Sequence, residues 1–340
     1  MGSSRNSPVA VIISKNNGYG LTIDAKILAQ ALEGLGISAT IVQPGDRPWS
    51  DRFFRRRKHD FIFHLERVYP AWLDAGGADI LIPNQERFPK RHIGRLKNID
   101  LVLTKTVHAR EIFASLGCNT EHVRFESKDL QDPTIKKDWK KFLHVAGGST
   151  LKGTEDILAI WRKHPEWPEL MLVQKQANLE KSLPENVDVA PGFLSESQLH
   201  ALMNSCGIHL CPSRSEGWGH YIHEALGCGA VVITTDAPPM NEFIDSSNGV
   251  VVETTRCEER HLGTNYFVAP SSLEATIQSL LAASPDKLEE IGRQARQSFL
   301  DNRNAFHDRL RVAIAGLCPE PLPSPLSDTT GRHGRGDQDQ

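Results

Sequence analysis

The chain has 340 residues, of which 39% are hydrophobic and 24% are charged. This composition indicates a soluble globular protein with one large or two ordinary domains, and it excludes disordered and fibrous chains. A formal net charge of −3 and an isoelectric point near 6.5 give no general attraction to nucleic acid or to anionic lipid. We therefore expect no nucleic-acid partner.

The cysteines and the hydrophobic runs bear on cellular location. The six cysteines form no Cys-x-x-Cys pair and lie mostly in or beside apolar segments, as reduced thiols do. They are Cys118, Cys206, Cys211, Cys228, Cys257 and Cys318. The N-terminus lacks the apolar stretch of a signal peptide, and no run approaches the roughly 18 apolar residues that span a bilayer. We expect a cytoplasmic protein that is at most peripheral on a membrane.

The first part of the chain alternates short apolar runs with helical patterns. The predicted strands lie at 9–13, 39–42, 61–63, 80–82 and 101–103, with helices at 23–35 and 107–116. This alternation favours parallel strands that are covered by helices. The sequence therefore predicts a Rossmann-like domain over residues 1–128.

A second series of the same kind follows a polar, proline-broken linker at 126–133. Its predicted strands lie at 142–145, 170–173, 187–190, 208–211 and 231–233, and its later helices at 273–281, 288–299 and 306–317. We predict a second Rossmann-like domain over 135–300, a last helix over 301–317, and a mobile tail over 318–340.

Two glutamates eight residues apart, Glu216 and Glu224, bracket a stretch that reads as strand, tight loop and helix. Gly217 and Gly219, on either side of Trp218, let the backbone turn closely and present free N–H groups at a helix start. Such a helix start is a ready site for an anionic phosphate. Phosphate and sugar hydroxyls could be held together between the two carboxylates.

A second glycine loop precedes Lys152. Gly147, Gly148 and Ser149 follow the first predicted strand of the second domain and stand ahead of a helix. Glycines in this position commonly let the backbone approach phosphate. A solvated lysine in the first turn of a helix is the alternative interpretation of Lys152 alone.

Taken together, these segments resemble the donor site of retaining glycosyltransferases of the GT-B fold, the "glycosyl transferases group 1" family with its Glu-x7-Glu signature. Residues 225–234 match the helix end and next strand of that family. The resemblance implies an α/β protein with two Rossmann-like domains facing a central cleft and a C-terminal helix crossing back to the first domain. The resemblance is strong over residues 142–252, approximately. In the first domain it extends only to the order of strands and helices.

The resemblance also implies roles for single residues. Glu216 would meet the hydroxyls of the transferred sugar, Glu224 would hold the nucleotide ribose, and Lys152 would neutralise the donor diphosphate. The family usually carries an arginine several residues before that lysine, where this chain has Gly147 and Gly148. Part of the expected positive charge is therefore missing, and Arg214 is the nearest candidate substitute.

Two further segments resemble parts of the donor site. Phe193 lies in a segment expected near the nucleotide base, although a strand end with a helix cap explains it nearly as well. Met240, Asn241 and Glu242 occupy the place of a glycine-rich loop that ends in Pro and Glu. The prolines before them have no N–H to offer a sugar, which puts the backbone contacts of that loop in doubt.

The first domain offers weaker candidates for the acceptor side. Gly18, Tyr19 and Gly20 would face the cleft and could touch acceptor or diphosphate, but a plain structural turn also explains them. His64 ends a predicted strand, where the family often places a histidine near the reacting sugar, and Glu66 follows it. A packed or exposed bystander is the alternative for both.

One concentrated basic and aromatic run lies between Arg52 and Lys58. Its functional interpretation is contact with a membrane surface or an anionic acceptor, and a solvated helix face is the alternative. Asp337 and Asp339 mimic a metal-binding pair but lie in the predicted tail. Because no other cluster has convincing metal spacing, we expect neither a required metal nor a cofactor.

The sequence thus favours a metal-independent retaining glycosyltransferase that uses a nucleotide diphosphate sugar, with a UDP- or GDP-sugar as the expected donor. A small molecule, a glycan or a lipid-linked molecule would be the acceptor. The resemblance implies that the departing phosphate helps to deprotonate the acceptor, so that no enzyme nucleophile is needed. Two alternatives stay open: a noncatalytic protein that binds a nucleotide sugar or glycan, and a glycoside hydrolase with paired carboxylates.

Overall fold

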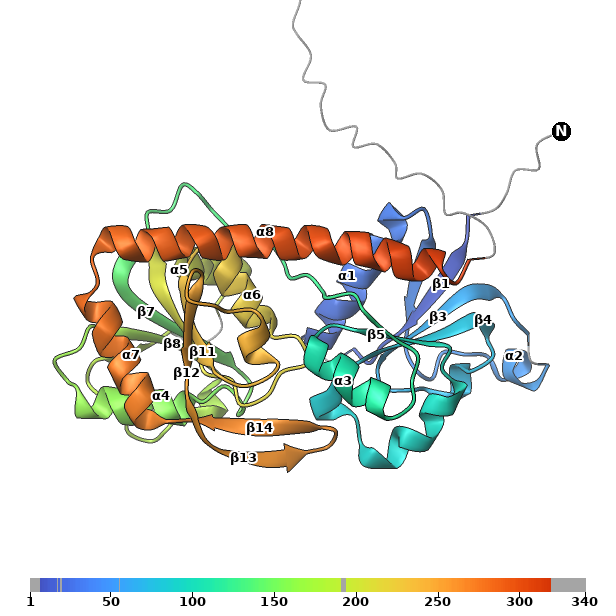
Figure 1. Cartoon of the computed structure of the whole chain (residues 1–340), viewed down its shortest axis with the longest axis horizontal. Helices are drawn as coiled ribbons and strands as arrows, with labels where there is room; N and C mark the ends of the chain where they lie inside the picture. The colour runs from blue at the N-terminus through green and yellow to red at the C-terminus, as the bar shows by residue number, and fades with distance from the viewer. Residues whose placement is uncertain (1–6, 17, 19, 55, 191–193, 319–340) are drawn as a thin grey trace, which may run out of the picture.

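The computed structural model describes residues 7–16, 18, 20–54, 56–190 and 194–318. It contains two six-stranded parallel sheets, one in each half of the chain, which lie side by side along the long axis of the molecule (Figure 1). Their strand orders are β2-β1-β3-β4-β5-β6 and β12-β11-β10-β7-β8-β9. The predicted α/β architecture with two Rossmann-like sheets is confirmed.

The N-terminal half builds its sheet from apolar runs whose side chains are buried by helices. Phe61, Phe63, Ile80 and Leu103 belong to one core cluster, which packs against the inner face of the first helix. The elements are β1 (Val9–Ile13), α1 (Gly20–Gly34), β2 (Ser38–Val42), α2 (Trp49–Phe53), β3 (His59–Glu66), η1 (Pro70–Trp72), β4 (Gly76–Pro83), η2 (Gln85–Arg87), η3 (Lys90–Asn98), β5 (Leu101–Thr104), α3 (Val107–Ser115) and β6 (Thr120–His122).

The C-terminal half repeats this construction around a separate core that includes Phe142, Trp161, Ile208 and Val231. Its elements are β7 (Asp138–Gly147), α4 (Thr154–Lys163), β8 (Leu170–Gln174), η4 (Gln176–Asn178), β9 (Val187–Val189), α5 (Glu196–Ser205), β10 (Cys206–Cys211), α6 (His220–Gly227), β11 (Val231–Thr235), η5 (Met240–Glu242), β12 (Gly249–Val252), β13 (Thr254–Arg260), β14 (Gly263–Val268), α7 (Pro270–Ala282) and α8 (Pro285–Ala315).

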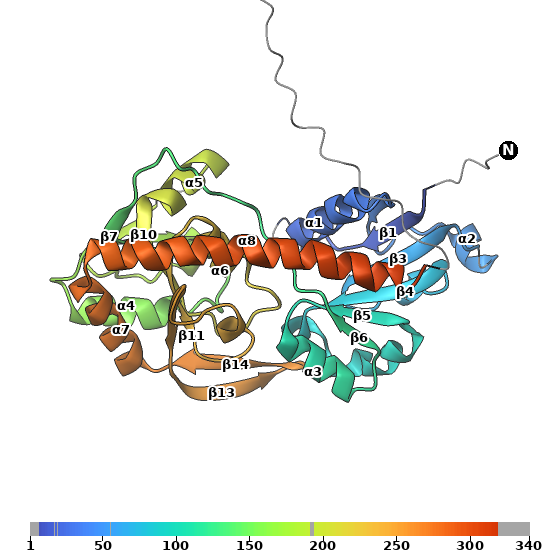
Figure 2. The ribbon, with the colours of Figure 1, turned by 45° about the horizontal axis from the view of Figure 1, so that its top comes forward.

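The last helix, α8, joins the two halves (Figure 2). It has 31 residues, and Phe306, Leu310 and Ile314 from its last turns belong to the core cluster of the N-terminal half. The predicted crossing of the C-terminal helix is therefore confirmed. The predicted break between 299 and 306 is wrong, because neither proline nor glycine interrupts this stretch and the helix runs through it.

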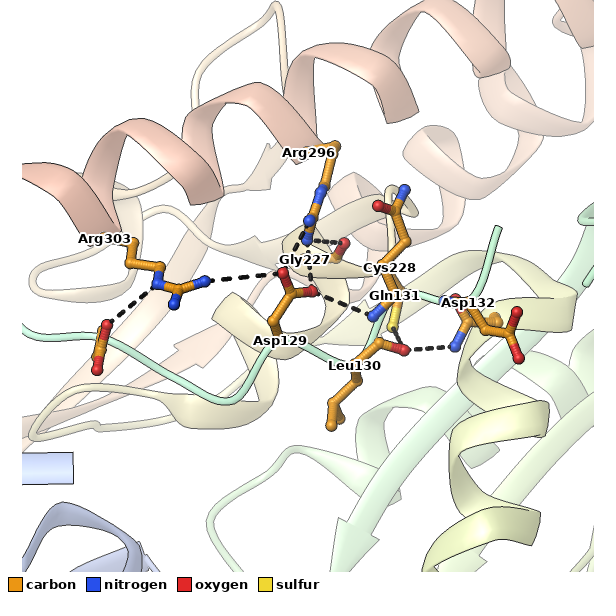
Figure 3. A network of polar contacts seen from close by, with 10 residues as sticks. Asp129, Leu130, Gln131, Asp132, Gly227, Cys228, Arg296 and Arg303 are labelled. Carbon is orange, nitrogen blue, oxygen red and sulfur yellow. Dashed lines mark hydrogen bonds and ion pairs between the residues drawn. The ribbon is translucent and has the colours of Figure 1, made fainter. Parts of the chain in front are cut away.

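The linker between the halves is fastened to α8 (Figure 3). Arg296 donates to both carboxylate oxygens of Asp129, at 2.6 and 2.8 Å, and also to the carbonyl oxygen of Gly227 at 2.9 Å. Arg303 approaches Glu126 and Asp129 at 3.6 and 4.0 Å. The fork of a guanidinium matches a carboxylate in two hydrogen bonds, so this contact fixes the linker in one orientation.

The antiparallel hairpin of β13 and β14 was not predicted. Its first strand, Thr-Thr-Arg-Cys-Glu-Glu-Arg, is polar and mostly exposed, so it lacks the apolar alternation that reveals a strand in sequence. Figure 1 shows it extending from the C-terminal half toward the N-terminal half, on the side of the molecule away from α8.

No helix among the described residues is both long and apolar enough to cross a bilayer. All six cysteines lack a disulfide partner; Cys206, Cys211 and Cys228 are buried, and Cys257 is exposed.

Candidate functional site

The loop after β10 brings the first of the two glutamates against the predicted phosphate lysine. Lys152 Nζ lies 2.5 Å from Glu216 Oε1, and the Ser213 hydroxyl donates to the same oxygen. The Ser213 hydroxyl is also 2.7 Å from the Tyr221 hydroxyl, and the ammonium of Lys152 stands 3.6 Å from the centre of the Tyr221 ring. A cation, a carboxylate and two hydroxyls thus converge at the start of α6.

Glycine conformations make this convergence possible. Gly153, the residue before α4, has φ +68°, and a Cβ there would come within 2.5 Å of the carbonyl oxygen of Pro212. The amide of Arg214 donates to the carbonyl of Leu151 at 2.9 Å. Because only glycine tolerates that φ and that approach, the loop that carries Lys152 can press against the loop that carries Glu216.

The second glutamate of the pair, Glu224, lies one helical turn into α6. Burial raises the pKa of its carboxyl above the usual range, although several nearby cations oppose that shift. Within the described residues, its carboxylate makes no hydrogen bond or ion pair, and it keeps some exposure. A partly buried acceptor without a protein donor is suited to receive hydroxyl groups from a ligand.

The glycine loop after β7 lies beside a second lysine, Lys175, which the sequence did not single out. Gly147 has φ +56°, and a Cβ on Gly148 would lie 3.1 Å from Cδ and 3.4 Å from Nζ of Lys175. The amide of Lys175 also donates to the carbonyl of Gly147 at 2.8 Å. The side chain of Lys175, from the end of β8, therefore lies over the loop where the family arginine is missing.

Residues at the carboxyl ends of both sheets meet at this site. The Gln85 amide, after β4, donates to the carbonyl oxygen of Glu216 at 2.8 Å. A Cβ on Gly217 would lie 2.5 Å from Asn84 Oδ1, and one on Gly20 would lie 3.9 Å from the His220 ring. In open α/β sheets, ligands bind at the carboxyl ends of the strands.

A buried polar network holds the two halves together beside the site. Lys105, with 2% of its side chain exposed, pairs with Asp24 at 2.5 Å and donates to Asn84 at 3.0 Å. Asp24 Oδ1 is 2.8 Å from His220 Nε2, and His220 Nδ1 is 2.8 Å from the Ser127 hydroxyl. Burial opposes ionisation of Asp24, but Lys105 and His220 prevail and lower its pKa to about 2.

The family is decided by a comparison with models of known protein families. The model described as "Glycosyl transferases group 1" matches residues 127–298, just over half of the chain. The chain belongs to the glycosyl transferases group 1 family.

Two curated relatives align with only part of the chain. A GDP-mannose:cellobiosyl-diphosphopolyprenol alpha-mannosyltransferase of Xanthomonas oryzae pv. oryzae is 28% identical over 134 residues, and one of Xanthomonas campestris is 27% identical over 135 residues. Each alignment covers 35% of this chain. The chain also spans only 35% of the length of each relative.

Solved structures extend the likeness to nearly the whole chain. A glycosyltransferase from Rickettsia africae ESF-5 is 14% identical, with a TM-score of 0.69 over 92% of this chain and 99% of the other. A sucrose-phosphate synthase from Thermosynechococcus elongatus is 15% identical, with a TM-score of 0.67 over 92% and 99%. Anabaena Alr3699/HepE, solved with UDP-glucose, is 13% identical, with a TM-score of 0.67 over 91% and 100%. At such low identity, these likenesses show the GT-B fold.

Several of the residues predicted for the donor site of this glycosyl transferases group 1 protein lie together. Glu216 and Lys152 touch, and Gly217 and Gly219 shape the loop between Glu216 and α6. Ser149 accepts a hydrogen bond from the amide of Leu151 and so stabilises the turn of the glycine loop. Phe193 and Tyr19 lie outside the described residues, as do Asp337 and Asp339.

Trp218 faces the interior of the molecule. It is 2% exposed, stacks on His223 at 3.9 Å and donates from its ring nitrogen to the Ser127 hydroxyl at 3.1 Å. It also belongs to the core cluster of the N-terminal half. An indole in this position anchors one half of the protein to the other and leaves no face for a donor.

Arg214 is already paired within the C-terminal half. Its guanidinium pairs with Glu155 at 2.5 Å and Asp156 at 3.3 Å, and it stacks on Phe267 at 4.4 Å. Two carboxylates at the start of α4 therefore already neutralise this guanidinium.

The residues of the proline-stiffened loop are also engaged elsewhere. Met240 is fully buried in a core cluster, and Asn241 donates to Asp236 at 3.0 Å. Glu242 accepts from the amides of Val107 and His108, at 2.7 and 2.8 Å, across the junction at the start of α3. Its carboxylate therefore caps a helix of the N-terminal half.

His64 has no ring nitrogen left for a reacting sugar. It is fully buried; its Nδ1 accepts from the amide of Tyr69 at 3.1 Å, which leaves Nε2 to donate to Asp79 at 2.9 Å. Glu66 pairs with the neighbouring Arg67. Gly18 has φ +68°, and its amide donates to Asn16 in the same loop and to Thr22 in the first turn of α1. We therefore assign His64 to the packing of the N-terminal half.

Sequence reasoning also missed Glu86, next to Gln85. Burial raises the pKa of its carboxyl to about 7, and the negative charge of Glu216 adds to that shift. Its Oε2 is buried and makes no hydrogen bond. Such a carboxyl cannot be recognised from sequence, because its environment comes from residues far away in the chain.

Proposed function

We propose that this protein transfers a sugar from a UDP- or GDP-linked donor to an acceptor hydroxyl, with retention at the anomeric carbon and without a metal ion. The observation that carries this proposal is the meeting of Lys152 and Glu216 between two glycine loops. Glu224, without a protein partner in the described residues, lies on the helix that follows.

The donor diphosphate would be held by cations and backbone amides. Lys152 and Lys175 come from two different loops, and the glycines let the amides at the start of α6 approach the phosphate oxygens. Fixed charges of this kind stabilise the charge that develops on a departing diphosphate. They supply the charge that a metal ion would otherwise provide. No group of three His, Cys, Asp or Glu side chains in the described ranges is arranged to hold one.

In the transfer, the bond between the anomeric carbon and the diphosphate oxygen breaks, and the acceptor oxygen bonds to the same face of that carbon. The hydroxyl proton of the acceptor passes to the departing phosphate oxygen. Glu216 would orient the sugar hydroxyls, and Glu224 those of the ribose. Donor binding would release Lys152 from Glu216, so that the lysine meets the phosphate.

The named substrates of similar proteins support this donor class. The Xanthomonas relatives are GDP-mannose enzymes by name, and Anabaena Alr3699/HepE was solved with UDP-glucose. The acceptor of the Xanthomonas enzymes is lipid-linked, which makes a lipid-linked acceptor one possibility for this chain beside a soluble sugar or glycan.

A surface around α2 fits peripheral contact with an anionic membrane. Trp49, Phe53 and Phe54 are 77%, 73% and 62% exposed, beside exposed Arg52 and Arg56. Exposed aromatic rings next to cations suit the interface of a bilayer.

Replacing the three aromatic residues by serine should abolish co-sedimentation with phosphatidylglycerol vesicles. Val312→Ser, at an exposed residue on α8, is the control and should not. Equal sedimentation of both variants would contradict membrane contact.

Donor turnover tests the proposed activity without knowledge of the acceptor. Purified protein is incubated with UDP-glucose or GDP-mannose, with and without EDTA, and slow transfer to water is followed by proton NMR. We expect the α anomer to appear first and EDTA to have no effect. The β anomer first would contradict retention, and binding without turnover would indicate a noncatalytic protein. Cleavage of a nitrophenyl glycoside that lacks a nucleotide would indicate a glycoside hydrolase.

A further inference from the structure

The turn of the β13–β14 hairpin is seated on the N-terminal half. The amide of Leu262 donates to the carbonyl of Gln85 at 3.2 Å, and Lys90 pairs with Glu259 at 2.8 Å. A Cβ on Gly263 would lie 3.1 Å from the Cα of Glu86. The hairpin therefore touches the segment whose Gln85 side chain holds Glu216.

Positive charge accumulates along this seam. The hairpin turn contributes Arg260 and His261, and the N-terminal half contributes cationic side chains from the end of β3 and from η2 and η3. The cationic residues of the N-terminal half are Arg67, Arg87, Lys90 and Arg91. Burial first, and then the charges of Arg260, Arg67, Arg87 and Arg91, lower the pKa of His261. These groups are thus close enough to repel one another.

Few negative groups compensate this charge. Glu66 is paired with Arg67, and Glu259 with Lys90. Across the described part of the chain, Arg87, Arg91 and Arg260 form no ion pair. Burial raises the pKa of the Glu86 carboxyl to about 7, so this group is only partly ionised near neutral pH. A net excess of cations remains between the hairpin and the N-terminal half.

The same seam is hollow and contains unsatisfied donors. Lys90, Arg91 and His261 line a cavity of 340 Å³, together with Pro89 and Glu259. The Nε atoms of Arg67 and Arg260 are buried without an acceptor. A buried N–H without an acceptor is costly, and it commonly marks a place for an ion or a ligand.

We propose that the hairpin turn and the N-terminal half together bind a phosphate or diphosphate group that belongs to the acceptor. This inference rests on the proposed glycosyl transfer, because the acceptor must reach the same junction as the donor. The donor diphosphate is assigned to Lys152 and Lys175 in the C-terminal half. The hairpin seam offers separate cations on the acceptor side, next to Gln85. A lipid diphosphate and a soluble sugar phosphate share the chemistry that this site recognises.

Binding of pyrophosphate tests this site directly. To silence the donor site, the titration is made in a Lys152→Met background, and the ring signals of His261 are followed by NMR. We expect pyrophosphate to raise the pKa of His261, because an anion offsets the surrounding cations. Adding Arg91→Gln and Arg260→Gln should weaken the binding at least tenfold. Arg293→Gln, on the exposed surface of α8, should leave it unchanged.

Pyrophosphate binding that leaves His261 unmoved, or that the double substitution does not weaken, would overturn the proposal. Nucleotide binding by the Arg91→Gln, Arg260→Gln protein with an intact Lys152 is measured in parallel. If it persists, the donor-site assignment survives a failure of the hairpin site. Glucose 1-phosphate and vesicles with phosphatidic acid then distinguish a soluble acceptor from a lipid acceptor. Binding of either one that depends on Arg91 and Arg260 supports the site. Binding to neither would contradict it.

Discussion

The two halves of the molecule bring different kinds of polar residue to their junction. In the C-terminal half, Glu224 has no protein partner among the described residues, and Lys152 and Glu216 bind one another in a place where a ligand could separate them. In the N-terminal half, Asp24, His64 and Lys105 are almost fully buried and bonded to protein groups.

This difference separates groups that can act on a ligand from groups that hold the protein together. A buried charge that is paired stabilises the fold only as long as its partner remains. A charge with a replaceable partner, or without one, is available for chemistry. We therefore propose that the C-terminal half carries the donor chemistry, and that the buried charges of the N-terminal half stabilise the fold.

The largest effect is expected at Glu216. Glu216→Gln keeps the size of the side chain but removes the charge that we propose to orient the sugar. We therefore expect transfer to fall at least a thousandfold, about 4 kcal/mol in the barrier. Nucleotide binding should change less than threefold. Glu253→Gln, at an exposed glutamate, is the matched control. Transfer retained within tenfold would place the chemistry elsewhere.

Lys105 should affect folding more than any other residue of the buried network. Lys105→Met leaves the carboxylate of Asp24 buried with only His220 as its partner, and it should lower the free energy of unfolding by about 3 kcal/mol at pH 7. Urea unfolding measures this loss, and Lys97→Met, at an exposed lysine, is the control. A loss below about 1 kcal/mol would mean that Lys105 does not anchor the two halves.

Glu86 should destabilise the protein in a pH-dependent way. Its folded pKa of about 7 lies above the ordinary value of 4.5, so the unfolded state loses its proton first as the pH rises. The contribution of Glu86 to stability is therefore greatest below pH 4.5 and falls between pH 4.5 and 7, by up to about 3 kcal/mol. Glu86→Gln removes this loss.

Thermal unfolding of wild type and Glu86→Gln at pH 5 and pH 8 provides the measurement. The variant should be more stable than the wild type by a larger margin at pH 8. An equal margin at both pH values would show that the carboxyl is not shifted.

The contact between the linker and α8 should have the smallest effect. Arg296→Gln removes a two-bond contact with Asp129 that is only partly buried, and it should cost about 1 to 2 kcal/mol. Urea unfolding of this variant is compared with that of Arg293→Gln, an exposed pair on the same helix that should cost almost nothing. Identical midpoints for the two variants would show that the fork does not stabilise the linker.

Local patterns in the sequence predicted the sheets and singled out the central residues of the proposed donor site. Glu216, Glu224 and Lys152 lie in short motifs whose glycines fix the local backbone, so their positions follow from nearby residues. The roles of Trp218, Arg214 and Glu242 depend on Ser127, on Glu155 and on the amides of α3, which are far away in the chain or on another element. No local pattern carries that information.

The same limit explains the elements that were missed. The strand β13 is polar and none of its residues is buried, so it lacks an apolar face, and Lys175 reaches the glycine loop only through the pairing of β7 with β8. His64 shows the converse: a strand-end histidine has the position of a site residue in sequence, but Tyr69 and Asp79 occupy both of its ring nitrogens.

The most direct measurement of the central claim is calorimetric titration of the wild type and of Lys152→Met with UDP, GDP and ADP. We expect one nucleotide to bind the wild type selectively and its affinity to fall at least thirtyfold in the variant, about 2 kcal/mol. If no nucleotide binds the wild type, or if Lys152→Met binds as tightly as the wild type does, then the loops around Lys152 and Glu216 are not a donor site.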